Sequence, residues 1–176
     1  MKKSLRISQL DTQSISDEQR QMQDRLLSGP RASIVGPFKV WLHQPELANV
    51  ADLFGQYCRF NASIDRKIAE LAIMQIARHT GAGFEWDHHY PYALQAGVTN
   101  AQLEELKKGD PVSGLDERSH MAHSVVREML TTHSLSDDSY RAAIKVLGES
   151  TLVVLVAVVG YYSFVSLTIN VFNVID

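Results

Sequence analysis

The segment from residue 151 to residue 172, TLVVLVAVVGYYSFVSLTINVF, contains no charged residue and is just long enough to cross a bilayer as a helix. It also contains polar residues such as Ser163, Ser166 and Asn170. Membrane helices are usually flanked by a cluster of Lys or Arg, and this segment has no such cluster. We therefore expect a helix that is buried inside a helical bundle or between subunits, and we expect no contact with a membrane.

The composition of the chain fits one helical domain. With 176 residues, of which 45% are hydrophobic, the chain is long and apolar enough to build one sizeable core. It has only 10 Gly and 5 Pro, which favours an all-α fold over a turn-rich β-sandwich. Acidic residues outnumber basic ones by 20 to 17, so we expect no nucleic-acid partner. The polar N-terminal residues lack the apolar region of a signal peptide, and we expect a cytoplasmic protein.

Helix start and stop signals divide the chain into predicted helices. Ser16 with Gln19 and Thr99 with Gln102 are typical of helix starts, and Gly97 is typical of a helix end. The predicted helices are 17–27, 45–60, 63–79, 84–96, 99–108, 116–132, 136–147 and 151–172. The pair in 136–172 loosely resembles the pair in 63–97, which suggests a duplicated helical hairpin. In 45–60 the apolar residues at helical spacing are Leu47, Val50, Leu53, Phe54 and Tyr57.

Glu85 and His89 are four residues apart and therefore share one face of a predicted helix. A carboxylate beside an imidazole favours the protonated ring, so this pair can move a proton near neutral pH without a cofactor. The alternative is an exposed ion pair with a small effect on stability. Pro91 favours the first interpretation, because it bends the helix just beyond His89 at a local energetic cost.

Glu70 interrupts the apolar pattern of the preceding helix. Its neighbours at helical spacing include Ile73 and Met74, which would place a carboxylate among apolar side chains. The alternative places Glu70 at the edge of the apolar face, where it pairs with Arg66 or Lys67. Helix geometry alone does not decide between the two.

Three stretches of the chain resemble the carboxymuconolactone decarboxylase family, which also contains the alkylhydroperoxidase D proteins. They are GPFKVWLHQPELA, RKIAELAIMQIARHTGAGFEWDHHYPYALQAGVT and LVAVVGYYSFVSLTINVF, and FEWDHH with Pro91 and Gly97 is the most specific part. The resemblance implies an alkylhydroperoxidase D-like multihelical bundle that assembles as a trimer or hexamer. It also implies one domain over 1–176, with an N-terminal helical extension (1–62), motif-bearing helices (63–109) and C-terminal helices (110–176).

The peroxidase branch of that family has an upstream Glu, a CxxC pair and a His four residues after the second Cys. If His89 is matched to that histidine, Glu70 matches the upstream acid, and Ala82 and Glu85 stand where the two cysteines would be. The chain has a single cysteine, Cys58, so peroxidase chemistry through a dithiol is not available. We expect Cys58 to be a small buried hydrophobic residue.

The decarboxylase branch has a Glu-x-x-x-His pair in this helix, and Glu85 and His89 match it. The resemblance therefore implies a lyase, a decarboxylase-like enzyme of aromatic degradation that acts on a small lactone or carboxylic acid without a cofactor. His89 would transfer the proton, Glu85 would orient the His89 imidazole, and Glu70 would be a second relay acid. Arg31 is a further candidate for holding a substrate carboxylate. The residues expected to contact the substrate are Trp41, Arg78, Trp86 and His88.

Two alternatives are open. Glu85-x-x-His88 and Glu117-x-x-His120 have the spacing of di-iron bundles, with Glu70 as a further ligand, although we expect no metal because the second pair follows a loop. The other alternative is a non-catalytic helical assembly module. In every case the uncharged last helix predicts a homo-oligomer, because it needs a partner surface.

Overall fold

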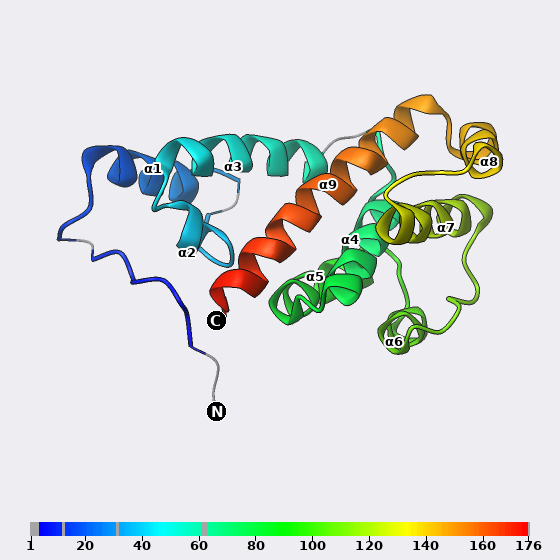
Figure 1. The fold of residues 1–176 in the computed structure, drawn as a ribbon, viewed down its shortest axis with the longest axis horizontal. Helices are drawn as coiled ribbons and strands as arrows, with labels where there is room; N and C mark the ends of the chain where they lie inside the picture. The colour runs from blue at the N-terminus through cyan, green and yellow to red at the C-terminus, as the bar shows by residue number, and fades with distance from the viewer. Residues whose placement is uncertain (1–3, 12, 31, 61–62, 176) are drawn as a thin grey trace.

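Helices make up the regular structure of the chain. The computed structural model describes residues 4–11, 13–30, 32–60 and 63–175, and within them it has nine helices and no strand (Figure 1). The all-α prediction is therefore confirmed, and each predicted helix is present. The helices are α1 (Asp17–Ser28), α2 (Phe38–Trp41), α3 (Pro45–Phe60), α4 (Arg66–Thr80), α5 (Gly83–Gln95), α6 (Asn100–Lys108), α7 (Glu117–Thr132), α8 (Asp137–Leu147) and α9 (Glu149–Phe172).

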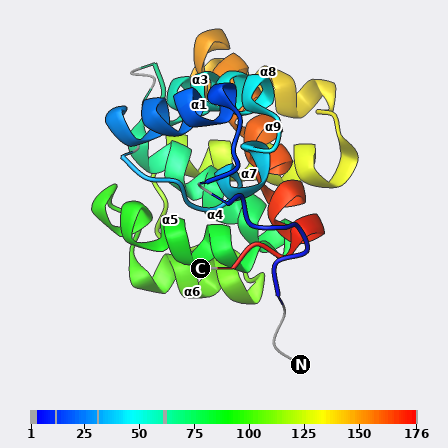
Figure 2. The same ribbon diagram turned by 90° about the vertical axis from the view of Figure 1, so that its left-hand side faces the viewer.

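The apolar helix α9 runs through the middle of the molecule. It contacts α3, α4, α5, α7 and α8, and it lies between α3 on one side and α4 on the other (Figure 1, Figure 2). By length and composition alone it is a candidate membrane span, a test that core helices of soluble proteins also pass, and 56% of its most apolar window is buried by the chain itself. The two hairpins of the suggested duplication differ in the length of their second helix, since α9 has 24 residues and its counterpart α5 has 13.

Helix α4 is the most enclosed helix of the site region. Every residue from Ile68 to Ala77 is buried, because α5, α7 and α9 pack around it. Its polar residues Glu70 and Gln75 are therefore forced into the interior along with the apolar ones. On the α6 side, α4 contributes Leu71 and Met74 to a second, smaller apolar cluster.

Two apolar stripes stay exposed on the outside of the chain. The outer stripe of α3 is exposed because the opposite side of that helix, with the small residues Ala48, Ala51 and Gly55, packs on the core. Gly55 is needed there, since a Cβ atom would collide with the Tyr161 hydroxyl of α9. The outer stripe of α3 is Leu47, Val50, Leu53, Phe54 and Tyr57. The outer stripe of α9 is Val153, Val156, Phe164, Leu167 and Val171.

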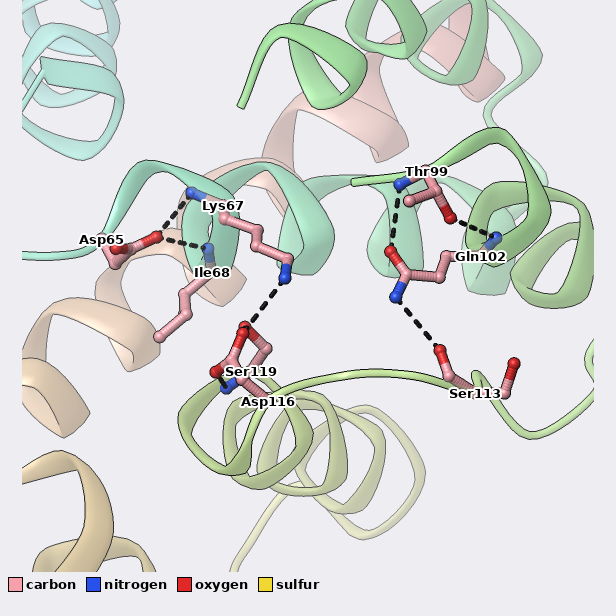
Figure 3. A network of polar contacts seen from close by, with 8 residues as sticks. All are labelled: Asp65, Lys67, Ile68, Thr99, Gln102, Ser113, Asp116 and Ser119. Carbon is pink, nitrogen blue, oxygen red and sulfur yellow. Dashed lines mark hydrogen bonds and ion pairs between the residues drawn. The ribbon is translucent and has the colours of Figure 1, made fainter. Parts of the chain in front are cut away.

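Polar contacts join the starts of α4 and α7 (Figure 3). Asp65 caps α4 by accepting hydrogen bonds from the backbone amides of Lys67 and Ile68. Lys67 Nζ lies 3.0 Å from Asp116 Oδ2, and Asp116 in turn caps α7 through the backbone amide of Ser119. These contacts fix α7 against α4.

Replacing Asp116 with alanine should lower the free energy of unfolding by about 1–2 kcal/mol at neutral pH, because α7 loses its N-cap. Hydrogen bonds from the Ser119 amide and hydroxyl and from Lys67 hold the pKa of the Asp116 carboxyl well below its ordinary value. The stabilisation should therefore be complete above about pH 4 and decline as the pH falls further. Urea denaturation of both proteins at several pH values measures this difference. Asp24→Ala, at an exposed position inside α1, is the control, and equal losses in both variants would contradict the capping role.

Candidate functional site

The imidazole of His89 lies between two carboxylates in the interior. Its Nδ1 atom is 2.8 Å from Glu70 Oε2, and its Nε2 atom is 3.1 Å from Glu85 Oε1. The three residues are 2%, 1% and 4% exposed, in the order His89, Glu70, Glu85. Both ring nitrogens therefore have a partner, and neither contacts bulk water.

Two adjacent helices supply these side chains. Glu85 and His89 lie one turn apart on α5, as their spacing predicts, and Glu70 reaches the ring from α4. The helices are joined at Gly81, which ends α4 in the left-handed conformation with φ of 68°. Glycine adopts this conformation without steric cost, so the chain can reverse within a short turn and pack α5 against α4.

Glu70 has a second partner at the protein surface. Its Oε1 atom lies 3.3 Å from Arg66 Nε, one turn earlier on α4, and the Arg66 side chain is 46% exposed. Glu70 is thus buried, as the first interpretation of the sequence expects, and it is also paired with Arg66, as the alternative expects. The carboxylate connects the buried ring of His89 to a cation at the surface.

The two carboxylates decide the protonation state of the ring. Burial lowers the pKa of the His89 imidazole, but the hydrogen bonds and negative charges of Glu70 and Glu85 outweigh this and raise it above its ordinary value. The raised pKa favours the protonated ring, in which each of the two N–H groups donates to one carboxylate. The two negative charges are balanced by the imidazolium and by Arg66.

A small cavity lies on the Glu85 side of this group. Its volume is about 30 Å³, which is room for about two water molecules. Glu85 and His89 lie in its wall, whereas Glu70 does not line it. The remaining lining residues are Val35, Pro37, Phe38, Gly55, Arg59, Phe84, His88, Tyr161, Tyr162 and Val165.

Of the residues expected to contact the substrate, only His88 lines the cavity. Trp41 lies in the core, where it stacks on Phe164 and its Nε1 donates to Thr168. Trp86 lies in the second apolar cluster, because it faces α6 rather than α9. Arg78 lines a different cleft, at the C-terminal end of α4. Arg31 lies outside the described residues. The structure therefore does not place Trp41, Trp86 or Arg78 at the cavity.

Three polar residues of the cavity were missed by the sequence analysis. Arg59 comes from the end of α3, and its guanidinium lies 4.7 Å from the centre of the Tyr92 ring. Tyr161 and Tyr162 come from α9, and the Tyr162 ring packs edge-on against His89. Burial, and then the charge of Glu85, raise the pKa of the Tyr162 hydroxyl well above its ordinary value, so it stays protonated as a donor. No local pattern marks these residues, because they meet only through packing.

Phe84 and His88 separate the cavity from an open groove on the outside of α5. Their rings are stacked, with centroids 5.8 Å apart and planes at 10°. Both residues line the cavity and also the outer groove, which Asp87, Pro91, Tyr92 and the segment 174–175 complete. This stacked pair is thus the wall between the buried acids and the surface.

The metal alternative finds little support in the placement of its ligands. Glu85 turns to His89 and not to His88, whose ring stacks on Phe84. Glu117 and His120 lie exposed on α7. In the part of the chain that the structure describes, no three His, Cys, Asp or Glu side chains form a group that could hold a metal ion.

Cys58 is a core residue, as the sequence analysis expected. It is fully buried on the inner side of α3, and burial raises the pKa of its thiol to about 12. It does not line the cavity beside His89. A thiolate nucleophile at this position is therefore not available near neutral pH.

Comparison with known proteins matches one part of the chain, which includes several residues of the site. Residues 45–109 match the sequence model of the carboxymuconolactone decarboxylase family, which belongs to the alkylhydroperoxidase D-like superfamily. The match runs from the start of α3 to the glycine that follows α6. It contains Arg59, Glu70, Glu85 and His89. Searches of curated proteins and of solved structures found no match.

The pKa of His89 should exceed 6.5 in the wild-type protein and should fall in Glu70→Gln, because the amide keeps the burial and removes a negative charge. NMR of the ring nitrogens measures both titrations. The stabilisation that the protonated ring provides is complete below about pH 6.5 and is lost as the pH rises through the folded-state pKa. The wild type should therefore lose more stability than Glu70→Gln over this range.

The matched control for this titration is Glu104→Gln, an exposed carboxylate on α6. It should leave the titration of His89 unchanged. If Glu70→Gln also leaves it unchanged, Glu70 does not set the protonation state of the ring.

Proposed function

We propose that this chain, whose residues 45–109 match the sequence model of the carboxymuconolactone decarboxylase family, is a cofactor-free carboxy-lyase for a small lactone acid. One observation carries the proposal: the imidazole of His89 is held between two buried carboxylates in the wall of a cavity. Titratable groups with shifted pKa values beside a cavity are typical of acid–base catalysis. The family match supports the reaction class, and the substrate is part of the proposal.

The chemistry needs a proton donor and an electron sink. When the bond between the ring carbon and the carboxylate breaks, carbon dioxide leaves and the electron pair spreads onto the unsaturated lactone carbonyl of the substrate. A carbon of this dienolate then takes up a proton, which restores the neutral lactone. The substrate supplies its own electron sink, so the protein needs to supply only the proton and a suitable environment.

Glu85 and His89 are the two groups of the acid–base set that face the cavity. Both nitrogens of His89 are engaged, and only Glu85, not Glu70, shares the cavity wall with the ring. His89 therefore passes its proton to the substrate either through the Glu85 carboxyl or directly when Glu85 moves aside. Glu70 stays bonded to Nδ1 and holds the ring in place, with Arg66 on its other oxygen.

Two further polar residues of the cavity can bind the carbonyl oxygen and a second carboxylate of such a substrate. The Tyr162 hydroxyl is a donor for the carbonyl oxygen on which negative charge develops. Arg59 suits a carboxylate that is retained, because pairing a cation with the departing carboxylate would stabilise the ground state. The walls at Phe38, Phe84 and Val165 are apolar and favour the charge-dispersed state.

The substrate enters by displacing part of the cavity wall. A volume of about 30 Å³ is much smaller than the few hundred cubic ångströms of an ordinary small-molecule site. The stacked rings of Phe84 and His88 are the thinnest barrier, since the outer groove begins on their far side. Rotation of these two side chains joins the groove to the cavity.

Replacing His89 with glutamine should lower kcat for a lactone acid such as carboxymuconolactone by at least about 100-fold, because the proton donor is lost. Arg59→Gln should mainly raise KM, since it removes a substrate contact. Release of carbon dioxide measures both, with circular dichroism as the test of folding. His120→Gln, at an exposed histidine of α7, is the control.

An unchanged rate in His89→Gln would remove His89 from the mechanism. If the wild-type protein releases no carbon dioxide from any lactone acid in a panel, the proposed reaction is wrong even if the fold and the pKa of His89 are as described.

We also propose that the chain forms a homo-oligomer, a trimer or hexamer, through its outer stripes. Together with the exposed Gly160, the outer stripe of α9 follows the length of the helix at spacings of three and four residues, which is the pattern of a helix face that packs against another helix. The outer stripe of α3 lies on a neighbouring helix, since α3 packs on α9. Exposed apolar surface of this extent is typical of a subunit interface. A non-catalytic assembly module would use the same surface, and the activity assay separates the two.

Sedimentation of the protein should give three or six times the chain mass of 19.7 kDa. Leu167→Glu should shift the mass toward that of the single chain, because it places a charge in the outer stripe of α9. Lys145→Glu, an exposed change on α8, should leave the mass unchanged. A wild-type monomer would contradict the proposal.

A further inference from the structure

A second cleft lies on the other side of α4 and shares no residue with the His89 cavity. Its volume is about 140 Å³. One wall is the C-terminal half of α4, the second is α7, and the third is the end of α6 with the loop that follows it. The residues that line it are Gln75, Arg78, His79, Leu106, Gly109, Asp110, Pro111, His123, Arg127 and Leu130.

The charged side chains of this cleft are mostly basic. Arg78 and Arg127 contribute two permanent positive charges, and Asp110 at the edge contributes one negative charge. In the part of the chain that the structure describes, no carboxylate forms an ion pair with either arginine. The cleft therefore has an excess of positive charge that no described side chain pairs with.

The backbone is shaped to hold Arg78 at this position. Gly109 ends α6 with a φ of 83°, and a Cβ atom at Gly109 would collide with the guanidinium of Arg78. The guanidinium thus rests on the turn between α6 and the following loop. The Arg78 side chain lines the cleft and is also exposed to solvent, so its planar N–H donors can be reached by a ligand.

Two buried polar atoms of the cleft have no hydrogen-bond partner among the described residues: Gln75 Oε1 and His123 Nδ1. Gln75 is 5% exposed, and its Nε2 atom donates to the His123 carbonyl oxygen over 3.1 Å. Because this bond must come from the amide nitrogen, it fixes the orientation of the amide and leaves Oε1 as an unused acceptor. A buried acceptor without a donor is unfavourable, so the site is set for a ligand that brings one.

We propose that this cleft binds a small oxyanion that also carries a hydroxyl group. Its charged oxygens would bind Arg78 and Arg127, and its hydroxyl would donate to Gln75 Oε1. A hydrogen phosphate group and a hydroxycarboxylate share this chemistry, and the cleft volume suits a group of that size. The buried acceptor distinguishes such ligands from anions that have only acceptor oxygens, because these would leave Gln75 Oε1 without a donor.

His123 supplies an internal reporter of binding. Burial, together with the charges of Arg127 and His120, holds the pKa of its imidazole below the ordinary value, so the ring is neutral near pH 7. The other charged or titratable groups that line the cleft are Arg78, His79 and Asp110. An anion bound beside Arg127 would raise the pKa of His123, because it offsets the positive charge.

The proposal is tested by NMR titration of the full chain at neutral pH with two pairs of probes. Inorganic phosphate is compared with sulfate, and glycolate with acetate, since each pair differs in the hydroxyl donor. In at least one pair the hydroxyl-bearing anion should bind at least ten-fold more tightly, shift the His123 ring signals and leave those of His89 unchanged. The pair that shows the preference identifies the source of the anion.

Variants assign that binding to the cleft. Arg127→Gln and Arg78→Gln should each weaken it at least ten-fold, and Arg20→Gln, at an exposed arginine of α1, should not. Gln75→Met should abolish the preference for the hydroxyl-bearing anion. The proposal is overturned if neither pair shows a preference, if no probe saturates, or if Arg20→Gln weakens binding as much as Arg127→Gln. The arginine variants change exposed side chains, so a folding defect in Gln75→Met would not obscure these outcomes.

Discussion

The contact of His89 with two buried carboxylates is the constraint around which the site is built. Two carboxylates cannot both stay charged in an interior without nearby cations, because removing them from water is costly. The imidazolium between them and Arg66 at the surface provide those cations. Removing the charge of His89 would leave Glu85 buried without a cation, so the charges of this group depend on one another.

The packing of α4 and α9 gives this charge group its surroundings. Helix α4 is buried along ten consecutive residues from Ile68 to Ala77, which forces its polar side chains to find partners inside the protein. Glu70 contacts His89. Gln75 donates a hydrogen bond to the His123 carbonyl oxygen of α7, but its Oε1 atom accepts none from the described residues. Helix α9 then covers the ring with Tyr162 and closes the cavity. One enclosed helix therefore positions both the acid–base group and the basic cleft.

The sequence predicts local features of this protein better than distant ones. Glu85 and His89 could be paired correctly because four residues make one helical turn, and the helix ends could be read from capping residues. Helical spacing says which residues share a face but not which helix that face meets. Trp86 and Arg78 were therefore expected beside His89, whereas the structure places them in an apolar cluster and in a second cleft, and Arg59 and Tyr162, from helices distant in sequence, were missed. The sequence predicted that the apolar residues of α3 share one face, but it did not predict that this face is exposed. The face is exposed because the small residues on the opposite side of α3 pack on the core.

A crystal structure of the protein with a bound lactone acid tests the central claim most directly, because it shows which groups converge on the reacting carbon. The account predicts that the acid occupies the space between Phe84 and Tyr162, with a carboxylate on Arg59. A carbon of the lactone should lie within reach of Glu85 or His89. An acid bound elsewhere, with the Glu70, His89 and Glu85 contacts closed and unchanged, would contradict the account and leave these residues a structural role only.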